Sequence, residues 1–202
     1  KASSDLIFRD TTPPHDIDRS KGLRLLARNI SLGLQFKLDN NDPDFPEIMH
    51  YFDPIRKQGG DNTDAYYSGA PINGRNTYRI TGHRGTARYF AITVLEDGNT
   101  PWGGQVTGNL IDDAVIVDED GNFELTVSPD PDPGDRGNWI QTTPDSWRLT
   151  FREFFADWEN EQPMRARIER VNDIEHDPVL TPAEVGRGLQ DTAEWVRDST
   201  LY

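Results

Sequence analysis

Apolar residues recur every three to four positions near the start of the chain: Leu23, Leu26, Ala27, Ile30 and Leu34. This spacing places them on one helical face and predicts a helix from about residue 17 to 36. The polar segment 1–15, which ends in Thr-Thr-Pro-Pro, is expected to be an irregular arm. Pro46 is expected to open a short second helix that reaches Tyr51.

A second amphipathic segment lies near the end of the chain, with its apolar face formed by Val185, Leu189, Ala193 and Val196. The sequence Thr181-Pro182-Ala183-Glu184 precedes it and has the form of a capping box with proline at the first helical position. These signals together predict a closing helix over about residues 182–197.

Between the two helices the period of the pattern becomes two, as in half-buried strands. Ala65–Ile72 and Arg75–Thr81 flank Asn73-Gly74, which predicts a hairpin. A second hairpin is expected around Asp120-Gly121. The other expected strands are Arg88–Glu96, Ala114–Val117, Phe123–Val127, Trp147–Arg152 and Met164–Val171.

This order of elements predicts an α+β protein, mainly an antiparallel β-sandwich with an N-terminal and a C-terminal helix. The expected organisation is an N-terminal arm and helical segment over 1–58, a sandwich domain over 59–178 and a C-terminal helix over 179–202. Two of the expected strands are predicted to face the core together, one through Trp147, Leu149 and Phe151 and the other through Phe90, Ile92 and Val94.

Five sequence blocks stand in the same order as in a known bacterial family. They are Asp61-Asn62-Thr63 with Tyr66-Tyr67, Ile72-Asn73-Gly74-Arg75, the run from Tyr78 to Ala87, Asn138-Trp139-Ile140, and the run from Arg148 to Arg152. Over roughly residues 60–171 the chain therefore resembles the family called domain of unknown function 1214. The resemblance implies a jelly-roll-like antiparallel β-sandwich and brings no catalytic residues. Many members carry more chain, so residues 1–202 are expected to be part of a larger protein.

The amino-acid composition excludes several classes of function. The 202 residues include 21 basic and 35 acidic side chains, a formal net charge of −14, and no cysteine. A protein this acidic lacks the basic face that a nucleic-acid phosphate backbone requires, so no nucleic-acid partner is expected. No apolar run approaches the roughly 18 residues of a membrane span. Without cysteine, disulfides and thiolate metal sites are excluded, and the compartment stays undecided.

The sequence contains none of the strong catalytic or phosphate-binding motifs. The four histidines are far apart in the sequence, so neither a metal site nor a cofactor is expected. The acidic turn around Asp118 and Asp120 fails as an EF-hand, because Ile116 and Val127 would occupy the first and last ligand positions.

Glu153 is the carboxyl group with the most informative position. By alternation it shares the inward face of its strand with Leu149 and Phe151. A buried carboxyl must be paired or protonated, so Glu153 is expected either to pair with Arg79, Arg88 or Arg148 or to act in catalysis.

Two further groups of side chains are candidate ligand contacts. Aromatic rings with adjacent carboxylates and amides suit sugar binding, and such sets are Asp61, Asn62, Tyr66 and Tyr67, together with the loop tryptophans Trp102 and Trp139. Arg84 and Arg88, close to His83, form a small basic cluster suited to an anion or partner contact.

Two functions therefore remain open. The first is a non-enzymatic module that forms a homo-oligomer, or contacts a further chain or domain, with a glycan as a possible ligand. The second is a carbohydrate-active hydrolase or lyase that uses Asp and Glu as acid and base. Two carboxylates facing each other in a deep aromatic cleft would favour the enzyme, and exposed apolar patches would favour assembly.

Overall fold

The computed structural model describes residues 2–52, 56, 60–98, 100–101, 103–132, 134, 137–174 and 180–201. The chain divides into two compact units. Residues 42–51 and 62–178 form a sandwich unit, and residues 1–41, 52–61 and 179–202 form a helical unit.

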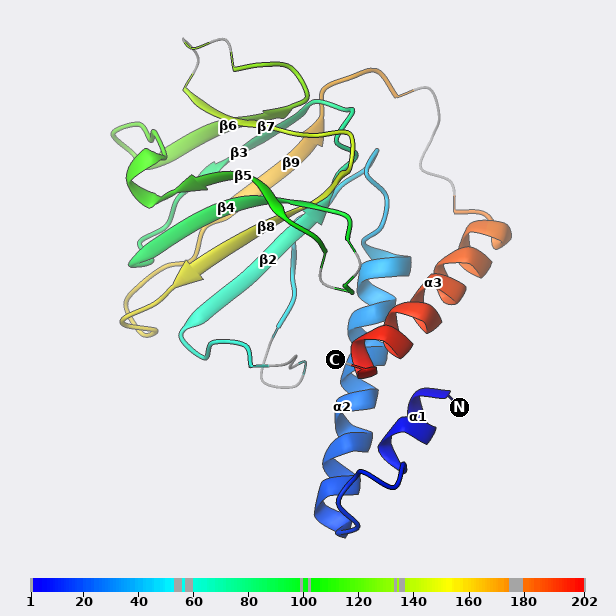
Figure 1. Cartoon of the computed structure of the whole chain (residues 1–202). Coiled ribbons are helices and arrows are strands. Elements are labelled where there is room, and N and C mark those ends of the chain that lie inside the picture. Colours follow the sequence, from blue (N-terminus) through cyan, green and yellow to red (C-terminus); the bar gives the residue numbers. More distant parts are fainter. Residues whose placement is uncertain are drawn as a thin grey trace. The chain divides into compact units, whose positions relative to one another are not determined.

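Two sheets make up the sandwich unit (Figure 1). The five-stranded sheet has the order β1-β2-β8-β4-β5, with the bounds Met49–His50, Ala65–Pro71, Ser146–Phe154, Tyr89–Glu96 and Val106–Ile111. The four-stranded sheet has the order β7-β6-β3-β9, with the bounds Asn138–Gln141, Asn122–Ser128, Tyr78–His83 and Arg165–Arg170. All neighbouring strands are antiparallel except the parallel pair β6 and β7. The predicted α+β class is therefore confirmed.

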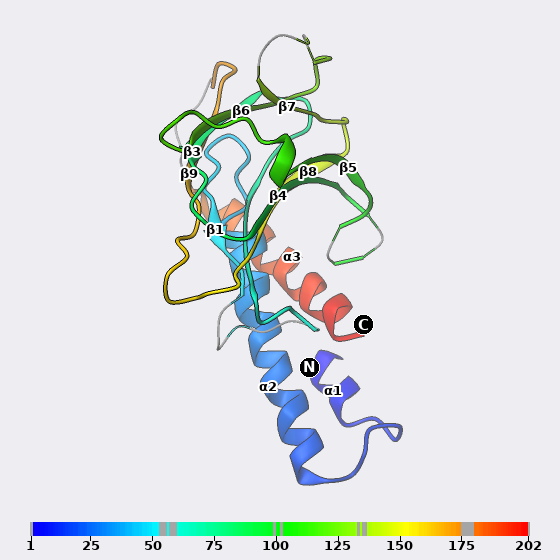
Figure 2. The ribbon, with the colours of Figure 1, turned by 90° about the vertical axis from the view of Figure 1, so that its left-hand side faces the viewer.

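The two sheets face each other across one core (Figure 2). The rings of Phe90 and Phe123, one from each sheet, have centroids 6.1 Å apart. Leu149 and Phe151 of β8 are fully buried beside β4, as their alternation predicted. Trp147 of the same strand is only partly buried, and its indole Nε1 donates to the Glu96 carbonyl at 3.0 Å.

The other face of β8 is also partly buried, which its polar side chains did not indicate. Arg148 is buried there, and its Nε donates to the Tyr51 hydroxyl at 2.9 Å. That hydroxyl in turn donates to the Leu149 carbonyl at 3.3 Å. Gly69 permits this approach, because a Cβ at that position would lie 1.9 Å from the Tyr51 oxygen.

The predicted hairpin at Asn73-Gly74 is wrong, because β2 and β3 belong to different sheets. Gly74 does not adopt the positive φ that a type I′ turn requires. Its amide donates to the Ser146 carbonyl at 2.9 Å, and a Cβ there would lie 1.8 Å from the Thr143 oxygen. The pair therefore forms a tightly packed corner that carries the chain from one sheet to the other.

Other local predictions are also corrected. Ala114–Val117 is not a strand, because a short 3-10 helix, η2, occupies Asp112–Ala114. The strand β6 pairs with β3 and β7 instead. The expected short helix after Pro46 is the two-residue strand β1, and the strand β5 has no counterpart among the predicted strands.

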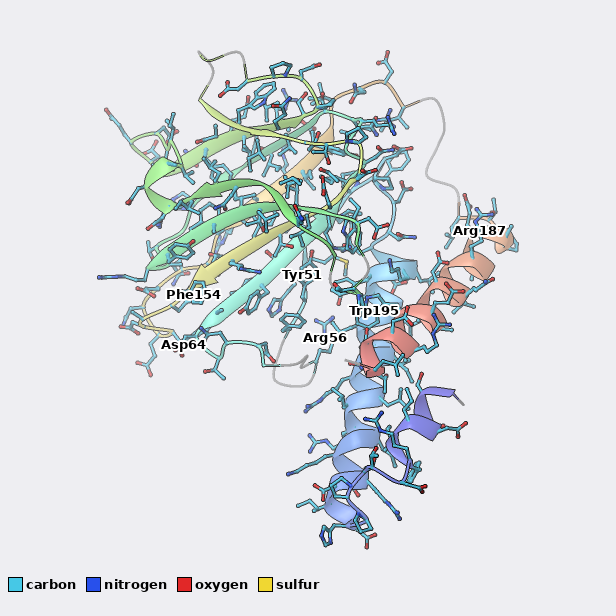
Figure 3. All side chains as sticks on the ribbon, in the orientation of Figure 1. Tyr51, Arg56, Asp64, Phe154, Arg187 and Trp195 are labelled. Atoms are coloured by element: carbon cyan, nitrogen blue, oxygen red, sulfur yellow. The ribbon has the colours of Figure 1, made fainter. Side chains whose placement is uncertain are left out.

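The described part of the helical unit contains three α-helices: α1, Ala2–Ile7; α2, Asp16–Leu34; and α3, Pro182–Leu201. The first replaces the expected irregular arm, and α2 continues as a π-helical turn, η1, over Gln35–Asp39. Side chains of α3 pack against α2 at Gly33, where a Cβ would lie 3.1 Å from the Trp195 ring, and Figure 3 labels this tryptophan on α3. The predicted capping box is confirmed, since Thr181 N donates to Glu184 Oε2 at 2.7 Å and Glu184 N donates to Thr181 Oγ1 at 3.3 Å.

Candidate functional site

A buried carboxyl group lies on the inner face of the five-stranded sheet. Glu153 of β8 is 0% exposed and stands opposite Tyr66 of β2 and Phe90 of β4. It shares this inward face with Leu149 and Phe151, as alternation along the strand predicted. A group that prefers water is thus placed at the end of the apolar core.

The hydrogen bonding of Glu153 is incomplete. Its Oε1 accepts a hydrogen bond from the Met164 amide at 2.6 Å. Its Oε2 has no partner among the described residues. Burial raises the pKa of Glu153 to about 7, against the opposing effects of the Met164 amide and the positive charge of Arg84. At neutral pH the group can therefore either hold or release a proton.

The three arginines that were expected as partners of Glu153 have other surroundings. Arg79 pairs with Glu169 on the outer face of the other sheet. Arg148 bonds to Tyr51, and Arg88 is exposed just before β4. The cation that influences Glu153 is Arg84, which also forms an ion pair with Asp112.

Tyr66 and His50 complete this cluster. Their rings stack with centroids 3.9 Å apart and an interplanar angle of 2°. Burial and the charge of Glu153 both raise the pKa of Tyr66. The sequence pattern missed His50, because it placed this residue in a helix and the pairing of β1 with β2 is a long-range event.

Two loops at this end of the sandwich are joined by hydrogen bonds. The Thr86 amide donates to the Gln162 carbonyl at 2.8 Å, and the Gln162 amide donates to Thr86 Oγ1 at 2.8 Å. The described residues line two hollows, one on the four-stranded sheet and one in the helical unit, and Glu153 lines neither of them. The cluster can store a proton, and it lies apart from both of these hollows.

The other sequence candidates are dispersed. Asn62 accepts the Asp64 amide at 2.9 Å and so closes a turn, while Asp61 belongs to the helical unit. Tyr67 lies on the face of β2 opposite to Tyr66. Trp102 lies outside the described residues.

Trp139 is a strand residue rather than the loop residue that the sequence predicted. It lies in β7, opposite Thr126 of β6 and between the buried residues Asn138 and Ile140. This alternation directs its indole to the outer face of the four-stranded sheet. Thr126 also lines the larger of the two hollows, a groove of about 830 Å³, which therefore lies beside Trp139.

The groove has its floor on β3, β6 and β9 and its border at segment 116–118. Its lining residues are Thr81, Gly82, His83, Ile116, Val117, Asp118, Asn122, Phe123, Glu124, Thr126, Gly137, Asn138 and Arg167.

The second hollow, of about 620 Å³, lies within the helical unit. The apolar side chains that line it come from α2 and α3: Leu26, Ile30, Leu34, Leu189, Ala193 and Val196. Both helices thus turn apolar residues toward an open surface, which is unusual for a part of a protein that contacts only water.

The described residues lack both a metal-binding cluster and a membrane-spanning helix. They contain no group of three or more His, Asp or Glu side chains arranged to hold a metal ion. Among the same residues, no helix combines the length and the apolar character that crossing a membrane requires.

A solved structure of an uncharacterized protein from Burkholderia cenocepacia is similar to almost the whole chain, with a TM-score of 0.89 and 29% identity over 98% of this chain. This chain spans only 54% of that protein's length. A structure from Vibrio parahaemolyticus shows 12% identity over 77% of this chain and 44% of that one, with a TM-score of 0.40. No curated protein matches the chain. Residues 62–157 match the family described as "Protein of unknown function (DUF1214)", which confirms the resemblance seen in the ordered sequence blocks.

Proposed function

We propose that this chain is an assembly module whose helical unit binds a second copy of itself through the hollow between α2 and α3. The observation that carries the proposal is the apolar lining of that hollow. Ile30 of α2 is 44% exposed and Leu189 of α3 is 49% exposed, although both are large aliphatic side chains. Covering them with a matching surface would release water from apolar area and favour association.

The distribution of charge supports a second copy as the partner. The helical unit contains 11 basic and 11 acidic residues, whereas the sandwich unit contains 10 basic and 24 acidic residues. The whole net charge of −14 therefore belongs to the sandwich. Two sandwich units repel each other, but two helical units meet without net repulsion.

A contact between two identical helical units would follow twofold symmetry. Each copy then presents the same patch, so that α2 and α3 of one copy face α2 and α3 of the other. A stable contact of this kind buries more than about 1,000 Å² in total, and the exposed aliphatic residues of both helices would form its centre.

Sedimentation tests the proposal. We expect the wild-type chain, at tens of micromolar, to sediment as a dimer, with twice the 22.9 kDa mass of one chain. Leu189→Asp should reduce it to a monomer, because it places a charge in the apolar contact. The matched control is Val106→Asp on β5, which changes a side chain of similar exposure, 55%, in the sandwich and should leave the dimer intact.

Two results would refute the proposal. One is a wild-type chain that sediments as a monomer. The other is a Leu189→Asp dimer as stable as the wild type. In the first case the apolar hollow would have a different occupant, such as a region of the kind that the longer Burkholderia protein has beyond its matched part.

The hydrolase alternative has less support. Glu153 has a pKa suited to a general acid, but it is fully buried and lines neither hollow. A glycosidase needs two carboxyl groups on either side of a bound sugar. The geometry around Glu153 does not favour that reaction.

A further inference from the structure

The groove on the outer face of the four-stranded sheet has a polar floor fixed by strand register. Thr81 of β3 stands between Glu124 of β6 and Arg167 of β9. Their neighbours along the strands, such as Ile80 and Leu125, enter the core, so these three side chains point outward. Arg167 Nε donates to Thr81 Oγ1 at 3.1 Å. The floor thus presents a hydroxyl, a carboxylate and a guanidinium in one row.

The border of the groove is apolar and exposed. Ile116 is 61% exposed and Val117 is 39% exposed, although both are β-branched aliphatic residues. They adjoin the polar floor within the same groove. A ligand with both hydroxyl groups and C–H surfaces would form hydrogen bonds with the floor and pack against the border.

Asn138 fastens this border to the sheet. Its Oδ1 accepts the Ile116 amide at 2.7 Å, and its Nδ2 donates to the Ile116 carbonyl at 2.8 Å and to the Glu124 carbonyl at 3.0 Å. Farther along, Asp118 Oδ1 accepts the amides of Asn122 at 2.8 Å and Asp120 at 3.0 Å. The groove is therefore formed in advance, which reduces the entropy lost when a ligand binds.

The charges of this face nearly cancel, in contrast to the sandwich as a whole. Glu124 and Asp118 line the groove together with Arg167. Beside the groove, Arg79 and Glu169 neutralise each other as an ion pair. The face therefore offers hydrogen-bonding groups with little net charge, which suits a ligand that is itself neutral.

We propose that this groove binds a short neutral oligosaccharide. Its volume of about 830 Å³ lies in the range of small-ligand sites, roughly 300–1,000 Å³. Glu124, Arg167 and Thr81 would bond to hydroxyl groups, and Ile116 and Val117 would pack against the C–H face of a sugar ring. Trp139, opposite Thr126 in the β6–β7 register, adds an aromatic ring beside the groove. This site belongs to the sandwich and is independent of the proposed helical contact.

Amide chemical-shift mapping on the labelled full chain tests the proposal. The probes are maltohexaose, cellohexaose, xylohexaose and chitohexaose, each added to about 10 mM, since affinities of weak sites lie in the millimolar range. We expect at least one of them to shift amides of Thr81, Ile116 and Arg167 in a saturable way. An arginine-rich peptide serves as the cationic comparison.

Matched variants locate the site. Glu124→Gln, in the floor, should weaken binding of the responding sugar about tenfold, because a charge-assisted hydrogen bond is lost. Glu169→Gln, on the same face but outside the lining, should leave the affinity within about twofold. The proposal is overturned if no sugar shifts the groove amides, if only the cationic peptide does, or if both variants behave alike.

Discussion

The sandwich unit buries a larger share of its apolar residues than the helical unit does, although Val106 and Ile116 are exposed on it. In the sandwich, Phe90, Ile92, Leu149 and Phe151 have no exposed surface. In the helical unit, large aliphatic side chains of α2 and α3 remain 40% exposed or more: Ile17, Leu23, Leu25, Ile30, Leu189 and Leu201. Two facing sheets close a core by themselves, whereas three helices in one small cluster leave part of each apolar face uncovered.

The two units also differ in how they carry charge. The sandwich holds the entire net charge of −14 and stays closed, while the helical unit is electrically balanced and open. High net charge opposes contact with like-charged copies, and exposed apolar surface favours contact. In the proposed assembly, the sandwich therefore resists contact with other copies and the helical unit makes that contact.

The largest expected effect concerns the closed core. Phe151→Ala removes a fully buried ring from the central strand β8 and should lower the free energy of unfolding by about 3–5 kcal/mol. Ile30→Ala, at an exposed position of α2, should cost less than about 1 kcal/mol in a monomeric sample. Urea melts followed by circular dichroism measure both. Equal costs for the two changes would remove the contrast between the units.

The next effect concerns Glu153, the carboxyl group that is buried in the sandwich. The pKa of Glu153 is about 7 in the folded chain against 4.5 as its ordinary value. The folded state therefore keeps a proton that the unfolded chain releases, and stability falls as pH rises from about 4.5 to 7. Glu153→Gln removes this penalty, so it should stabilise the protein at pH 8 by up to about 3 kcal/mol and have little effect at pH 4.

Denaturant melts of this variant and of the wild type at several pH values make that measurement. Glu169→Gln is the control, because the ion pair with Arg79 lowers the pKa of the exposed Glu169. It should produce no gain that grows with pH. A Glu153→Gln gain that is the same at pH 4 and pH 8 would show that folding leaves the pKa of Glu153 at its ordinary value.

The smallest effect concerns Asn29, one of the buried polar residues of the helical unit. Asn29 of α2 is 0% exposed, and neither its Oδ1 nor its Nδ2 has a partner among the described residues. Asn29→Leu should raise the free energy of unfolding by about 1–2 kcal/mol, because an unsatisfied buried amide is replaced by an apolar side chain of similar size. Thermal melts of Asn29→Leu, made in the monomeric Leu189→Asp variant and compared with that variant alone, measure the effect. A lower melting temperature would mean that the Asn29 amide has hydrogen-bond partners in solution.

Features set by neighbouring residues could be predicted from the sequence. The capping box at Thr181 and Glu184 needs only residues three positions apart. The long helix α2 and the inward alternation of Leu149, Phe151 and Glu153 follow from periods of 3.6 and 2 residues. The ordered sequence blocks likewise indicated the resemblance to the DUF1214 family over roughly residues 60–171, and residues 62–157 match that family.

Features set by distant partners required the tertiary structure. Asn73-Gly74 has the local form of a hairpin turn, but β2 pairs with β8 and β3 with β6 and β9, so the pair became a corner between sheets. Three other features depend on distant partners in the same way, so the hydrophobic pattern could not predict them. They are the stacking of His50 on Tyr66, the pairing of β7 with β6, and the hydrogen bonds of Asn138 at the groove. Hydrophobic periodicity reports which face of a strand is buried, but the strand that covers or pairs with it is chosen by packing across the whole domain.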